Sequence, residues 1–183
     1  MYPSFAPRTL KPMASSKERS PSTRSRELAA TNALRAQADR LFRDATECVR
    51  QRERYARLVD VGAQDAEQAA ALRVACLCDE VLLGSVKNYE TAASGVSSRS
   101  QLEWVQRANA LWHASREYQR RHQECDQRSR QLGANHSASH LGELALQYDL
   151  EASALLALRM ALVSYQNCCP DAELKDRPQT FVA

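Results

Sequence analysis

Along residues 104–132, mostly apolar and small residues recur at alternating intervals of four and three positions. The members of this stripe are Trp104, Ala108, Leu111, Ser115, Tyr118, His122, Cys125, Ser129 and Leu132. This spacing places them all on one face of an α-helix that packs lengthwise against other helices. A β-strand alternates its side chains with a period of two and cannot collect this set on one face. The pattern predicts a single long helix over 101–132.

Three further segments, 27–60, 66–93 and 139–168, have helical periodicity. In the first, an apolar stripe is interrupted by Arg52, whose long stem can lie along apolar surface while its charged head reaches water. The members of that stripe are Leu34, Ala38, Leu41, Ala45, Cys48, Tyr55 and Val59. Gly62 is the expected end of this helix.

The remaining two segments differ in how their apolar residues are distributed. For the helix over 66–93, the predicted core-facing stripe consists of Ala70, Val74, Leu77, Val81 and Gly84, widened by Leu72, Cys76 and Leu83. The helix over 139–168 is apolar on nearly every side around 154–158, which predicts that it is the most buried of the four. Pro170 is expected to prevent its continuation.

Composition supports an all-α fold. The chain has 183 residues with 5 glycines, 6 prolines, 6% aromatic residues and no isoleucine, whereas strands favour β-branched and aromatic residues. The connections between the helices are too short to run back along such long helices, so neighbours must be antiparallel. We expect an up-down-up-down four-helix bundle over 26–169, a basic flexible or partner-docking arm over 1–25 and a loose tail over 170–183.

The charge is distributed unevenly along the chain. Of 25 basic and 22 acidic residues, six basic residues and one acidic residue lie in the first 26 positions. The rest is nearly neutral, which does not favour a phosphate-binding body, although nucleic acid stays a possible partner. The N-terminus has no signal-peptide pattern, and six cysteines lie mostly among apolar neighbours, so we expect a cytoplasmic, reducing location and no membrane partner. An organelle transit peptide within 1–25 stays open.

One pair of residues raises the possibility of catalysis. Arg116 and His122 have five residues between them, a spacing that resembles the Arg–His pair of the HEPN ribonucleases, which are helical bundles that cleave RNA. The same spacing occurs at Arg107 with His113 and at Arg130 with His136. The alternative function that this resemblance implies is an RNA-binding or RNA-cleaving bundle with Arg116 and His122 at its site.

Metal and cofactor patterns are weak. His136 and His140 have the spacing of two neighbours on one helix face, but His136 is expected to precede the helix start. The cysteine pairs Cys76/Cys78 and Cys168/Cys169 lack the two-residue gap of common zinc sites. We therefore expect no cofactor and no metal, with His136 and His140 as the weak candidates.

These patterns together favour a non-enzymatic structural or adaptor protein, a subunit of a larger intracellular assembly. Other proteins would bind to the helix faces and to the terminal arms, because polar arms that cannot fold alone can become ordered on binding. The candidate partner-binding residues in the arms are Tyr2, Phe5, Arg8, Leu10 and Phe181.

Overall fold

The computed structural model describes residues 21–96, 102–132 and 138–172. Within these residues the chain is all-helical, with four α-helices, one short 3₁₀ segment and no strand. The α-helices are α1 (Pro21–Asp60), α2 (Asp65–Ser94), α3 (Glu103–Leu132) and α4 (Ala138–Cys168), and Pro170–Ala172 forms the 3₁₀ turn η1. The all-α prediction is confirmed. The terminal candidates Tyr2, Phe5, Arg8, Leu10 and Phe181 lie outside the described residues.

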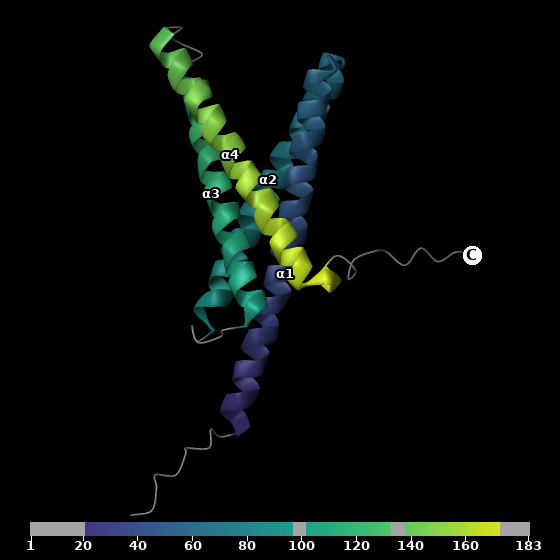
Figure 1. Ribbon diagram of the computed structural model, residues 1–183, viewed down its shortest axis with the longest axis vertical. Coiled ribbons are helices and arrows are strands. Elements are labelled where there is room, and N and C mark those ends of the chain that lie inside the picture. Colours follow the sequence, from purple (N-terminus) through teal and green to yellow (C-terminus); the bar gives the residue numbers. More distant parts are fainter. Residues whose placement is uncertain (1–20, 97–101, 133–137, 173–183) are drawn as a thin grey trace, which may run out of the picture.

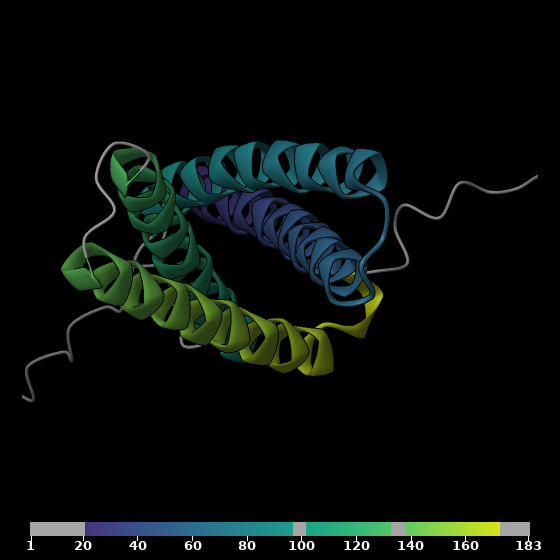
Figure 2. The ribbon, with the colours of Figure 1, turned by 90° about the horizontal axis from the view of Figure 1, so that it is seen from above.

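The helices form two pairs. α1 packs mainly against α2, and α3 packs mainly against α4, while contacts between the pairs are fewer. The pairs cross near the lower half of Figure 1 and diverge toward the C-terminal ends of α1 and α3. Figure 2 shows the two pairs from above, with α2 and α4 at the outer edges. The outer faces of α2 and α4 are therefore those most open to other molecules.

The α1–α2 turn depends on a glycine. Gly62 has a positive φ of 64°, a conformation that glycine adopts without strain. The amide of Ala63 donates to the carbonyl oxygen of Leu58 at 2.9 Å, which closes the last turn of α1. The prediction that α1 ends at Gly62 is thus confirmed to within two residues.

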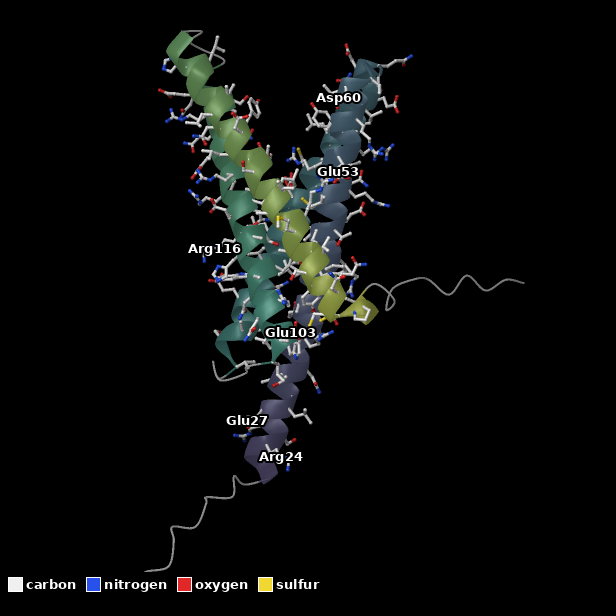
Figure 3. All side chains as sticks on the ribbon, viewed as in Figure 1. Arg24, Glu27, Glu53, Asp60, Glu103 and Arg116 are labelled. Atoms are coloured by element: carbon white, nitrogen blue, oxygen red, sulfur yellow. The ribbon has the colours of Figure 1, made fainter. Side chains whose placement is uncertain are left out.

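The first turns of α1 project beyond the other helices. Arg24 and Glu27 lie on this projecting end in Figure 3, and residues 24–29 are all exposed. The helix begins at Pro21, which lies within the segment predicted to be an arm. Burial begins at Leu34, the first member of the predicted stripe.

The main core fills the region where the pairs cross. On α1 and α3 it contains the predicted stripes from Leu34 to Cys48 and from Ala108 to Tyr118, whereas Val59 and Ser129 are exposed. Phe42 and Tyr165 pack ring against ring, with centroids 5.5 Å apart, and this contact joins α1 to α4. Burial of these side chains is the main source of stability, because each large apolar group removed from water contributes about 1.5–3 kcal/mol.

The predicted core stripe of α2 is wrong. Ala70, Val74, Leu77, Val81 and Gly84 are exposed, and this set is called the α2 outer stripe below. The residues that α2 buries are Ala71, Ala75, Leu82, Ser85, Val86 and Tyr89. The sequence contains two apolar stripes with helical spacing, and the buried one combines Ala71 and Ala75 with the larger residues Leu82, Val86 and Tyr89.

The prediction that α4 is the most buried helix is also wrong. Ala154, Leu158, Leu162 and Tyr165 are buried, but an opposite set consisting of Leu156, Met160 and Val163 is exposed. A helix in a two-pair arrangement can bury only the face turned toward its neighbours, however apolar the other faces are. No helix in the described part of the chain has the length and apolar character needed to cross a bilayer.

This orientation of α4 predicts a large difference between two residues that are two positions apart. Leu158→Ala should lower the free energy of unfolding by about 3 kcal/mol, because Leu158 is completely buried and leaves a cavity. Met160→Ala, at a side chain that is 68% exposed, should change it by less than about 0.5 kcal/mol. Urea denaturation measures both values, and similar losses would contradict the orientation.

Candidate functional site

A polar cluster lies where the two helix pairs begin to diverge. Each α-helix contributes one charged or titratable residue to it: Arg52 from α1, Asp79 from α2, His122 from α3 and Glu151 from α4. We call this set the four-helix polar cluster. The side chains of Arg52 and Asp79 are only 14% and 11% exposed, so the ion pair between them is largely shielded from water. Arg52 thus does not extend its head into water as predicted.

The hydrogen bonds of the cluster define the role of His122. An Arg52 Nη2 atom lies 2.7 Å from Nε2 of His122, and an arginine can only donate. Nε2 must therefore accept, which leaves the proton on Nδ1, and Nδ1–H donates to Glu151 Oε1 at 2.7 Å. This chain of hydrogen bonds connects α1, α3 and α4, and the Arg52–Asp79 ion pair adds α2.

Two neutral donors complete the coordination of Asp79. The Tyr118 hydroxyl and the Cys48 thiol each donate to Asp79 Oδ1 at 3.1 Å. Burial raises the pKa of both groups, and the nearby Asp79 carboxylate raises them further. Both groups consequently keep their protons and remain donors, so that the buried carboxyl group of Asp79 has hydrogen-bond partners from α1 and α3.

The carboxyl group of Glu151 is held in its ionised form. Burial by itself would raise its pKa, but the hydrogen bond and electrostatic interaction with His122, the hydrogen bond with Cys125 and the charge of Arg52 outweigh burial. The net result is that the pKa of Glu151 is lowered. Its carboxylate accepts the Nδ1–H of His122 and so joins α3 to α4.

A groove of about 460 Å³ between α2 and α3 reaches the cluster from solvent. Its lining includes the partly buried residues Arg52, Asp79 and His122 and the exposed residues Glu80 and Arg130. Both ring nitrogens of His122 are already engaged by protein groups. General acid–base catalysis needs a nitrogen that can reach a substrate, so this arrangement favours a role in holding the helices together.

The second notable surface is the outer face of α4. Leu156, Met160 and Val163 follow one another at intervals of four and three, and their exposed fractions are 56%, 68% and 57%. We call these three residues the α4 outer stripe. Between 152 and 168 the sequence has one charged residue, Arg159, which forms an ion pair with Glu53 of α1. An apolar surface of this kind on a helix is typical of a protein–protein contact site.

The structure does not bring Arg116 and His122 into one group. Arg116 lies on the outer side of α3 (Figure 3), over the ring of Trp112 at 5.5 Å and 4.0 Å from Glu90. His122 instead points toward α1 and α4, where it contacts Arg52 and Glu151. The HEPN-like interpretation therefore gains no geometric support from this pair.

The structure describes one of the two metal-site candidates. His136 lies outside the described residues, and His140 is exposed at the start of α4. In the ranges that the structure describes, no three or more His, Cys, Asp or Glu side chains are grouped so that they could hold a metal ion.

Arg52 and His122 are recognisable in the sequence as polar interruptions of apolar stripes, whereas Asp79 and Glu151 were not predicted to belong to a site. Asp79 lies between the buried residues Ala75 and Leu82, at intervals of four and three, and Glu151 lies three residues before the buried Ala154. The available signal was therefore a charged or titratable residue within the buried face of each helix. This signal identifies Asp79 only once the buried face of α2 is known, because the predicted core stripe of α2 was the exposed one.

With this geometry established, known proteins add no further information: no family model, curated protein or solved structure matches the chain.

We expect the Arg52 ion pair to be worth far more than an exposed pair. Arg52→Leu should lower the free energy of unfolding by about 3 kcal/mol, because it leaves the Asp79 carboxylate buried without its cation. The control is Arg120→Leu, which breaks the exposed pairs with Glu117 and Glu124 and should cause only a small fraction of that loss. Equal losses in chemical denaturation would contradict the shielding of the cluster.

The lowered pKa of Glu151 predicts a loss of stability in acid. Its contribution should be fully present above the ordinary value of 4.5 and should disappear as the pH falls through the lower folded-state value. The free energy of unfolding of the wild type and of Glu151→Gln, measured between pH 7 and pH 3, should therefore converge below about pH 4.5. A difference that is constant across this range would show that the pKa of Glu151 is the same in the folded and the unfolded protein.

Proposed function

We propose that this chain is a non-enzymatic structural or adaptor protein, a subunit of a larger intracellular protein assembly, built as an antiparallel up-down-up-down bundle. The observation that carries the proposal is the exposure of Leu156, Met160 and Val163 on an almost uncharged face of α4. Leaving three large apolar side chains in water on one rigid helix is unfavourable, and a partner that covers them would remove this cost.

The chemistry of this face indicates the class of partner. Intervals of four and three suit a helix or a helical groove that takes up side chains at the same spacing. A nucleic acid would require cations along the face, and Arg159, the one charged residue there, is already paired with Glu53. We therefore propose a protein partner with an apolar helical surface.

The terminal arms and the compartment belong to the same proposal. The arm predicted over 1–25 and the tail predicted over 170–183 are proposed to dock on neighbouring subunits, through the parts that precede residue 21 and follow residue 172. The location is proposed to be cytoplasmic and reducing, on the sequence argument alone.

The test is affinity purification of the full chain from its native cells, in parallel with Met160→Glu and with a chain lacking residues 1–20. A charge at position 160 should abolish recovery of the partner, because it would have to be buried in an apolar contact. Val61→Glu, at a 75% exposed apolar residue in the α1–α2 turn, is the matched control and should retain the partner.

Two outcomes would contradict the proposal. One is that the wild-type chain is recovered alone. The other is that Met160→Glu retains every partner that Val61→Glu retains while its circular dichroism and thermal unfolding match the wild type. Loss of the partner only on removal of residues 1–20 would assign binding to the arm in place of α4.

A further inference from the structure

The α2 outer stripe has the features of a coiled-coil contact that lacks its second helix. Val74, Leu77 and Val81 are 40%, 61% and 52% exposed, and Ala70 and Gly84 continue the same intervals of four and three. The next position in this series is Asn88, which is also exposed. Ala75 and Leu82 are buried on a different side of α2, so that α2 can contact α1 and another helix at the same time.

The residue types at these positions indicate how many helices would associate. In heptad notation, with Val74 at position a, position a holds Val74, Val81 and Asn88, and position d holds Ala70, Leu77 and Gly84. β-Branched residues at a with leucine at d favour two-stranded parallel coiled coils. A single asparagine at a further specifies a dimer in register, since the two amides can bond to each other.

The charges beside the stripe select the same orientation. Arg73, Glu80 and Lys87 recur every seven residues along one edge, at position g. An antiparallel pair that overlaps the whole stripe from Ala70 to Asn88 brings the two g edges together, with Glu80 near Glu80 of the second copy and Arg73 near its Lys87. Like charges at such short range are destabilising.

A parallel pair avoids these repulsions. It places each g edge beside the e edge of the other helix, which carries the uncharged residues Ala71, Cys78 and Ser85. Ala71 and Ser85 are buried within the chain's own fold, so this edge of the stripe adjoins α1. Toward the N-terminus the apolar contact stops at Ala70, because the preceding position of the series is Glu67.

We propose that a second copy of this chain docks on the α2 outer stripe, with the two α2 helices parallel and in register. The dimer contact is independent of the partner contact proposed for α4, because the two stripes lie on different helices at opposite edges of the molecule (Figure 2). Failure of either proposal leaves the other standing.

Gly84 allows a test by gain of affinity. A Cβ at Gly84 meets no atom within 4 Å, so a larger side chain there does not disturb the folded chain. Gly84→Leu fills a d position in both helices and should tighten the dimer by roughly tenfold or more. Leu77→Glu should abolish the dimer, whereas Leu156→Glu on α4 should leave it unchanged. Sedimentation equilibrium of the full-length wild type and of these three variants measures the dissociation constant of the dimer.

The orientation is tested by cross-linking. In a chain with Cys76→Ser, the substitution Gly84→Cys should form an intermolecular disulfide under mild oxidation, because parallel pairing places the two positions side by side. The same chain with Leu77→Glu should not form it.

Three results would overturn the proposal. The first is a wild-type chain that is monomeric at millimolar concentration together with a Gly84→Leu chain that is also monomeric. The second is a dimer that survives Leu77→Glu but not Leu156→Glu, which would place self-association on α4. The third is a dimer that Gly84→Leu strengthens but Gly84→Cys does not cross-link, which would exclude the parallel register.

Discussion

The four-helix polar cluster is the interaction on which the arrangement of the helices depends. Arg52, Asp79, His122 and Glu151 come from four different helices, and each is expensive to bury unless the other three are present. Apolar packing below the cluster is tolerant of small shifts, because leucine and alanine contacts have little directionality. Hydrogen bonds with defined donors and acceptors do not tolerate such shifts. The cluster therefore sets the register of the two helix pairs. Above this level the pairs diverge, and residues such as Val59 and Tyr148 become exposed.

A second polar contact reinforces the arrangement at the opposite end of the core. Asp39 is 3% exposed and accepts a hydrogen bond from the Tyr165 hydroxyl at 2.7 Å, which joins α1 to α4. Arg35 donates to the same carboxylate and stacks over the Trp104 ring of α3 at 5.0 Å. The core is thus bounded by two buried or partly buried polar groups, and the apolar residues between them provide most of the stability. The outer stripes of α2 and α4 therefore take no part in the packing of the described helices.

Those outer faces explain why composition alone was a poor guide to burial. Both α2 and α4 have more apolar residues at helical spacing than one face requires. For α2 the exposed stripe contains Val74, Leu77 and Val81, and the buried set contains residues at least as large, Leu82, Val86 and Tyr89. Periodicity identifies each stripe but does not rank them, because either can pack against a neighbouring helix. The choice depends on the distance to α1, and only the assembled structure provides that distance.

The sequence by itself determined the all-helical class, the approximate bounds of the four helices, the turn at Gly62 and the buried stripes of α1 and α3. These features follow from local constraints: the 3.6-residue period, the conformational freedom of glycine and the absence of a competing stripe on those two helices. Only the tertiary structure decided which faces of α2 and α4 are buried and which acids accompany Arg52 and His122. The physical reason is that Asp79 and Glu151 are separated from their partners by 27 and 29 positions along the chain, and no local pattern specifies which distant charges will meet.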